Sequence, residues 1–222
     1  MLRDTIKIPK SERENEIYFR VLSECSNEFI SDMTHIAILS RMQHYGVPTR
    51  LLDITTNALV ALYFCCENKA KWDVDGVVYF FQPSAKQVKT FDSDTVSILA
   101  SLARFSKQEK EELKCKALEC IEVIKNRPNS ATEIIREFNN LECVKRLIHE
   151  VRAEKNYFDN IVNPNDLLGN YFIIPKKDNP RIIRQNGAFI IFGLNGIMEL
   201  KDVAMGKVRI SKEGKQKISV DN

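Results

Sequence analysis

The densest group of chemically capable side chains lies in residues 43–57, which read QHYGVPTRLLDITTN. His44 can exchange a proton near neutral pH. Arg50 carries a planar guanidinium suited to phosphate or carboxylate, and Asp53 supplies a carboxylate. A segment that only packs would use Leu, Ile and Val instead. We therefore interpret it as a structured loop that delivers polar groups to one site.

Arg50 and Asp53 have two interpretations that the sequence leaves open. In the first, they form an ion pair that fixes the loop, because buried arginines are usually paired. In the second, Arg50 binds an anionic ligand and Asp53 orients the guanidinium. The role of His44 is also open. A lone histidine is more often structural, but the nearby Gly46 would let a ligand approach the backbone closely, which favours a functional role.

A second group of polar residues lies in residues 179–189, NPRIIRQNGAF. If residues 181–185 form a strand, Arg181 and Gln185 share one face. Asn186 and Gly187 form a strong turn signal, so a hairpin or bulge is the purely structural interpretation. We expect Gln185 to face a pocket beside the apolar residues that follow.

The two groups together define the candidate site. The candidate catalytic residues are His44, Arg50 and Gln185, and we expect all three to face one pocket. The candidate ligand-binding residues are the polar, aromatic and glycine positions around them: Gln43, Tyr45, Gly46, Thr49, Asp53, Thr55, Asn57, Arg181, Gly187 and Phe189.

Composition limits the class of protein. The 222 residues suffice for one substantial domain, and 44% hydrophobic with 28% charged residues is ordinary for a globular chain. A formal charge of +3 does not by itself argue for nucleic acid. No apolar run approaches the roughly 18 residues of a membrane span, so we expect no membrane partner. Because the first residues are polar and have no apolar core, we expect no secretory signal.

Cysteine and glycine motifs exclude several chemistries. None of the six cysteines forms a C-x-x-C pair, so we predict reduced thiols in a cytoplasmic protein and no metal site. The sequence contains no G-x-x-x-x-G-K-[ST] phosphate loop and no G-x-G-x-x-G fingerprint. It also lacks a G-x-S-x-G serine elbow.

Helices on both sides must position the first group. Apolar spacing predicts helices over residues 17–30 and 33–44 after an irregular or extended lead-in over 1–15. Gly46 suits a left-handed cap, and Pro48 cannot continue the helix. Residues 49–53 are expected to be extended. The helix predicted from 57 to 68 is apolar nearly all round, so we expect it to be buried.

The rest of the chain alternates strand and helix signals. We predict helices over residues 96–105, 107–124, from 130 and over 141–155, a turn at 163–166, and strands over 77–82, 171–174, 181–185, 187–192, 197–200 and 208–210 before a frayed lysine-rich tail. The predicted fold is α+β: one domain over 1–222 with a small mixed or antiparallel β core and flanking helices. Its core spans 9–195, with a central helical insertion over 106–156 and a tail over 201–222.

Both polar groups resemble motifs of one protein family. QHYGVPTRLLDITTNALVALYF resembles the central signature of the FRG domain, Q-H-x-G-x-P-T-R-L-L-D-W-T-x-N-P-L-V-A-L-Y-F. Ile54 replaces its usual Trp and Ala58 its usual Pro. NPRIIRQNGAFIIFG resembles the closing motif R-I-x-x-Q-x-G-x-F. The resemblance covers residues 9–195, but the Phe-Arg-Gly motif that names the family is absent.

The resemblance implies a function. FRG domains are bacterial and phage-associated, occur in toxin and phage-defence contexts, and have been placed near ADP-ribosyltransferase-like folds. That relation implies a split β core and NAD as cofactor. It places Gln185 near the reacting ribose, where a glutamate is usual, and Arg50 on the pyrophosphate. The alternative is a non-catalytic module that binds a nucleotide, nucleic acid or protein, because the naming motif and the glutamate are both missing.

Overall fold

A four-stranded mixed sheet holds both polar segments. The computed structural model describes residues 5–7, 13–159, 161–176, 180–199 and 204–220. The sheet order is β2-β6-β5-β4, formed by Leu51–Thr55, Gly187–Phe192, Asn170–Ile174 and Val88–Thr90. β6 lies antiparallel between β2 and β5, and β4 runs parallel to β5. The predicted α+β class with a mixed β core is confirmed.

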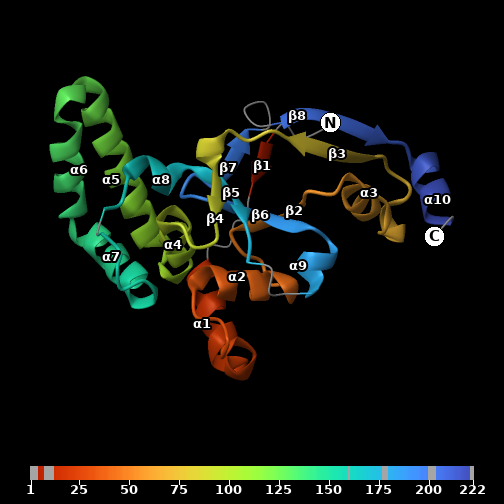
Figure 1. The fold of residues 1–222 in the computed structure, drawn as a ribbon, viewed down its shortest axis with the longest axis horizontal. Coiled ribbons are helices and arrows are strands. Elements are labelled where there is room, and N and C mark those ends of the chain that lie inside the picture. Colours follow the sequence, from red (N-terminus) through yellow and green to blue (C-terminus); the bar gives the residue numbers. More distant parts are fainter. Residues whose placement is uncertain (1–4, 8–12, 160, 177–179, 200–203, 221–222) are drawn as a thin grey trace.

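Two smaller sheets complete the β structure. β3 (Gly76–Phe81) pairs antiparallel with β8 (Ala204–Ile210), and β1 (Thr5–Lys7) pairs antiparallel with β7 (Ile197–Glu199). Figure 1 shows β3 and β8 on one side of β2 and β6. On that side the rings of Phe81 and Phe172 lie 5.7 Å apart, in an apolar cluster that includes residues of β2.

Three helices flank the first polar segment. They are α1 (Glu14–Glu24), α2 (His35–His44) and α3 (Ala58–Cys66). Thr34 caps the start of α2, since its side chain accepts a hydrogen bond from the N–H of Ala37. Beyond its end, Gly46 has a φ of +76°, which confirms the predicted left-handed cap. α2 therefore delivers His44 to the start of the loop that leads into β2.

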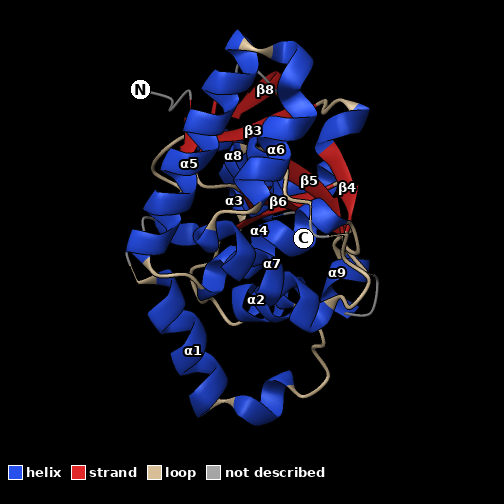
Figure 2. Cartoon of the chain, turned by 90° about the vertical axis from the view of Figure 1, so that its left-hand side faces the viewer, coloured by secondary structure: helices blue, strands red, loops and turns tan. Residues whose placement is uncertain are grey.

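A helical block separates β4 from β5 in the sequence. It contains α4 (Asp94–Ser101), α5 (Lys107–Asn126), α6 (Ala131–Asn139), α7 (Glu142–Glu154) and α8 (Pro164–Leu168). Parallel strands require a long crossover connection, and this block supplies it. Figure 2 shows α5, α6 and α7 in front of the strands. The helical residues predicted as an insertion, 106–156, form α5 to α7. None of the helices in the described ranges is long and apolar enough to cross a membrane.

Short 3₁₀ helices mark several connections: Ser26–Phe29, Lys69–Lys71, Ala85–Gln87, Leu102–Arg104 and Pro128–Ser130. The first of them means that the helix predicted over 17–30 is interrupted after Glu24.

Three predicted elements are wrong. Residues 181–185, expected as a strand, lie mostly in α9 (Pro180–Arg184), because proline suits the first turn of a helix. The turn expected at 163–166 begins α8, where the Asn163 side chain accepts from the N–H of Asn165. The tail expected to be frayed forms α10 (Lys212–Val220), in which the buried Lys215 donates to the carbonyl of Lys71 at 3.0 Å.

The burial expected for α3 is also wrong. Leu59 is 75% exposed, Tyr63 and Phe64 are exposed as well, and Cys66 is the residue of this helix that is fully buried. α3 lies towards one end of the molecule, where its main contacts in the described residues are with β2, β3 and α10 (Figure 1). The apolar composition of α3 predicted that it would be buried, but too few elements pack against it to cover all of its apolar side chains.

Candidate functional site

Strand pairing brings the two polar segments together. In the antiparallel register of β2 and β6, Asp53 lies opposite Phe189 and Thr55 opposite Gly187. The Thr55 hydroxyl donates to the carbonyl oxygen of Gln185 at 2.7 Å. Asn186 adopts a φ of 46°, so a tight turn does precede β6, although it joins a helix to a strand. Residues far apart in sequence therefore share one corner of the sheet.

A cavity of about 590 Å³ opens at this corner. Six of the predicted site residues line it: His44, Asp53, Thr55, Gln185, Gly187 and Phe189. The other walls come from β2, α3, β3, α9 and β6 and are largely apolar and aromatic: Leu52, Ile54, Ala61, Phe64, Val77, Val78, Tyr79, Phe81, Ile182 and Ala188, with Cys65 and Glu67 beside them. His44 and Gln185 thus face one pocket, as predicted.

The free edge of β2 runs along this cavity. The carbonyl of Arg50 accepts from Phe192 at one end of the pairing, and the N–H of Thr56 donates to Asn186 at the other. Antiparallel pairing alternates, so the N–H and C=O groups of the odd-numbered Asp53 and Thr55 point away from β6. Within the described residues no strand pairs with that edge. Since Asp53 and Thr55 line the cavity, these backbone groups lie beside it.

Side-chain alternation divides the cavity into two halves. Leu52 and Ile54 point to the side covered by β3, where they join an apolar cluster with Phe81. Asp53 and Thr55 point to the opposite side, towards α2 and α9. The cavity therefore combines an apolar half with a half that carries a carboxylate and a hydroxyl.

A hydrogen-bond chain orients the Asp53 carboxylate. The Gln43 amide donates from Nε2 to Oδ2 of Asp53 at 3.3 Å, and its Oε1 accepts from the Thr49 hydroxyl at 2.7 Å. The Thr49 oxygen accepts in turn from the N–H of Leu51 at 3.1 Å. Gln43 and Thr49, both predicted as ligand contacts, thus act on the carboxylate in this structure.

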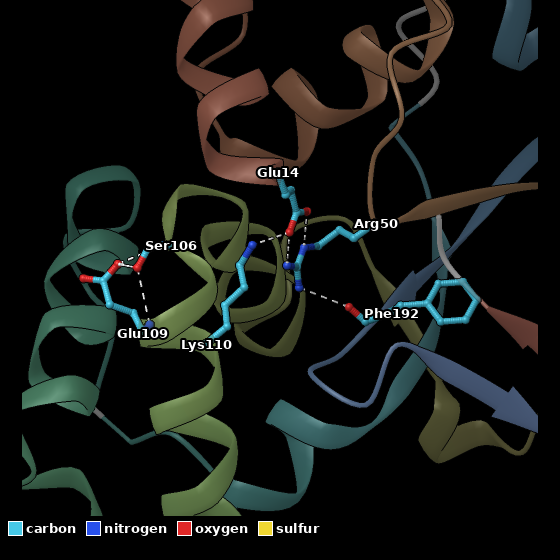
Figure 3. Close-up of polar contacts among 6 residues, drawn as sticks. All are labelled: Glu14, Arg50, Ser106, Glu109, Lys110 and Phe192. Carbon is cyan, nitrogen blue, oxygen red and sulfur yellow. Dashed lines mark hydrogen bonds and ion pairs between the residues drawn. The ribbon is translucent and has the colours of Figure 1, made fainter. Parts of the chain in front are cut away.

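Arg50 does not lie in this cavity, so the expectation that it shares a pocket with Gln185 is wrong. Its guanidinium is 3% exposed and binds Glu14 through two hydrogen bonds, Nε to Oε1 at 2.9 Å and Nη2 to Oε2 at 2.6 Å (Figure 3). Nη1 donates to the carbonyl of Phe192 at 3.2 Å, and Lys110 donates to Glu14 at 2.5 Å. The Arg50–Asp53 ion pair is wrong for the same reason.

The Glu14 network is a buried structural clip. Burial acts to raise the pKa of Glu14, but the positive charges of Arg50 and Lys110 outweigh burial and hold that pKa below its usual value. Burial also lowers the pKa of Lys110, against the attraction of Glu14. The network ties α1 and α5 to β2 and β6. The sequence analysis did not identify Glu14 as a partner of Arg50. It is one of several charged residues in a polar segment, and no motif distinguishes it.

The remaining predicted residues lie around the site. Tyr45 is exposed and donates to Glu28 at 2.7 Å. Asn57 caps α3 by accepting from the N–H of Leu59 at 2.9 Å. Gly46 turns the chain after α2, as noted above. The Arg181 side chain lies outside the described part of the structure.

Sequence reasoning missed the cavity wall contributed by β3. Tyr79 and Phe81 belong to a strand that was predicted, but no sequence signal places that strand beside β2. All six cysteines are free thiols, and Cys65 lines the cavity. In the described ranges, no three His, Cys, Asp or Glu side chains gather closely enough to hold a metal ion.

One family matches the chain. The sequence model of the FRG domain matches residues 2–73, a segment that contains α1, α2, β2 and α3 and therefore the first polar group. The second polar group lies beyond the matched segment. No curated protein and no solved structure matches the chain. Residues 2–73 of this 222-residue chain are therefore similar to the FRG domain.

Proposed function

We propose that this cavity binds NAD through one of its nucleosides, as an ADP-ribosyltransferase-like site. One observation carries the proposal: an oriented carboxylate, an unpaired strand edge and aromatic walls converge on a single cavity. Its volume of about 590 Å³ is typical of small-molecule pockets.

The strand edge supports recognition of a base or a carboxamide. An outward N–H and C=O on one residue, such as Asp53 or Thr55, is complementary to a primary carboxamide or to the edge of adenine. Phe64, Tyr79 and Phe189 supply apolar and aromatic surface for a planar ring. The Asp53 carboxylate and the Gln185 amide can hold ribose hydroxyls.

The charged side chains that line the cavity favour a nucleoside there rather than a phosphate. None of the described residues that line it is Lys or Arg, whereas Asp53 and Glu67 are acidic. Arg50, the residue that the resemblance assigns to the pyrophosphate, is fully engaged with Glu14. The phosphates of NAD would therefore lie outside.

Asp53 can supply the negative charge that Gln185, a neutral amide, cannot. Cleavage of the nicotinamide–ribose bond leaves positive charge on the ribose, and a nearby carboxylate stabilises that charge. Gln185 cannot act as a base but can position a hydroxyl. His44 can accept the proton of an incoming nucleophile. Consumption of NAD would suit the toxin or phage-defence context that the resemblance implies.

Isothermal titration with NAD and with nicotinamide riboside tests the proposal. We expect Asp53→Asn to weaken both ligands about tenfold, because it removes the charge and keeps the shape. Asp73→Asn, at an exposed acid that does not line the cavity, is the matched control. Chromatography for released nicotinamide and mass spectrometry for ADP-ribosylated protein test the chemistry. Failure of both ligands to bind the full chain would refute the proposal.

Binding without chemistry is the second candidate, and the absent Phe-Arg-Gly motif together with Gln185 favours it. In that case NAD binds in an Asp53-dependent way but yields no nicotinamide. Nucleic acid suits the cavity less well, because binding of a phosphate backbone requires cationic side chains.

A further inference from the structure

A second cavity, of about 520 Å³, adjoins the first. Its floor is apolar and comes from α2, β5, β6, α9 and the segment after β4: Ile36, Phe91, Ile173, Ile182 and Phe189. Ser31, Thr34, Ser40, Arg41 and Lys176 contribute polar groups, with Asp32 beside Arg41. None of the site residues predicted from the sequence lines it except Phe189.

The two cavities lie along one face of α2. Ala37, Ser40 and Arg41 line the second cavity and His44 lines the first. Positions i, i+3, i+4 and i+7 fall on the same side of a helix. Ile182 and Phe189 border both cavities. A ligand lying along this face could therefore reach both cavities.

Arg41 is the cation on this face. Its guanidinium binds Asp32 through two hydrogen bonds, Nε to Oδ2 at 2.5 Å and Nη2 to Oδ1 at 3.0 Å, and Nη2 also donates to Ser31 at 3.3 Å. The Arg41 side chain is nevertheless 32% exposed, whereas that of Arg50 is 3% exposed. The hydrogen bond that Arg41 donates to the Asp32 carboxylate raises the pKa of Arg41, so the guanidinium stays charged. One helical turn separates it from His44. Asp32 offsets part of the charge, while Lys176 and the Ser40 hydroxyl add to the groups that suit a phosphate.

We infer that the ligand is a dinucleotide that spans both cavities. One nucleoside occupies the first cavity, the second base lies on the apolar floor of the other, and the phosphates between them pass Arg41. The inference rests on the proposed function, because the first nucleoside is placed at Asp53. It adds that the site selects two linked nucleosides over one, and that Arg41, not Arg50, contacts the phosphates.

Titration of the full chain with nicotinamide riboside and with NAD tests the inference. We expect NAD to bind at least tenfold more tightly, with an affinity that falls as salt rises. Ala37→Leu narrows only the second cavity and should weaken NAD about tenfold while leaving nicotinamide riboside unchanged. Arg41→Gln should weaken NAD and flatten its salt dependence, whereas Arg41→Lys should retain most of the affinity. Thermal unfolding confirms that each variant is folded.

The outcomes separate this inference from the proposed function. Equal affinities for the two ligands, or NAD binding that Ala37→Leu does not change, would overturn the dinucleotide inference while the Asp53-dependent nucleoside site stands. If neither ligand binds, or if NAD binds independently of Asp53, the proposed function fails and the inference fails with it.

Discussion

At the scale of single residues, the two most conspicuous charges of the first polar segment have separate tasks. Arg50 belongs to a buried network with Glu14, Lys110 and a backbone carbonyl. Asp53 lines the cavity, and its carboxylate accepts a hydrogen bond from Gln43. Sequence proximity suggested that the two would pair. Arg50 directly precedes β2 and Asp53 lies within it, three positions further on, so along the extended backbone their side chains point to opposite faces.

Removing Glu14 tests the structural role of Arg50. Glu14→Gln leaves two buried cations without their anion and should lower the free energy of unfolding by about 3 kcal/mol. Urea unfolding measures it, with the exposed Glu16→Gln as control, for which a change within about 0.5 kcal/mol is expected. Equal effects of both substitutions would contradict the assignment of Arg50 to a buried clip.

His35 makes stability depend on pH. The Tyr18 hydroxyl bonds to its Nδ1 at 3.0 Å, and burial, followed by the charge of Arg104, lowers its pKa to about 4. Between pH 6.5 and 4 the unfolded chain binds a proton at this histidine that the folded chain does not. Stability should therefore fall by about 3 kcal/mol as pH drops through this window.

Urea unfolding at pH 7 and at pH 4.5 measures the effect as a difference between wild type and His35→Gln. The comparison is needed because burial raises the pKa of the neighbouring Glu154, which works in the opposite direction. His149→Gln, at an exposed histidine, is the matched control. If wild type and His35→Gln lose the same stability on acidification, His35 is not the titrating group.

At the scale of elements, α9 and β2 define the shape of the site. α9 replaces an expected strand and places Ile182 between two cavities, with Gln185 directly after its last residue. β2 is an edge strand whose unpaired groups line one of those cavities. A short apolar segment does not show from its sequence whether it will form a helix or a strand, or whether a strand will lie at the edge of a sheet. Both outcomes depend on the segments that pack against it.

At the scale of the whole molecule, the FRG match covers residues 2–73, but the site needs elements from beyond it. β2 pairs with β6, the cavity requires β3 and α9, and Glu14 is held partly by Lys110 in α5. The matched segment supplies a helical frame and one edge strand. The remainder of the chain supplies the sheet that supports them.

A fragment of residues 1–73 should therefore not fold by itself. Its β2 would have no partner, since Leu51 lies opposite Ile191 in the intact chain, and Arg50 would lose the carbonyl of Phe192. We expect circular dichroism to show no cooperative thermal transition for the fragment, in contrast to the full chain. A sharp transition in the fragment would show that the matched segment folds alone.

The sequence by itself determined the helices with clear apolar spacing, the left-handed cap at Gly46, the mixed helix and sheet class, and the likeness of residues 43–64 to the FRG signature. These depend on local backbone preferences and on residue identity. Only the tertiary structure decided that Arg50 binds Glu14, that α3 is exposed, and that Asp53 shares a cavity with Gln185. Those outcomes depend on which segments, far apart in the sequence, pack together on folding. The local sequence does not contain that information.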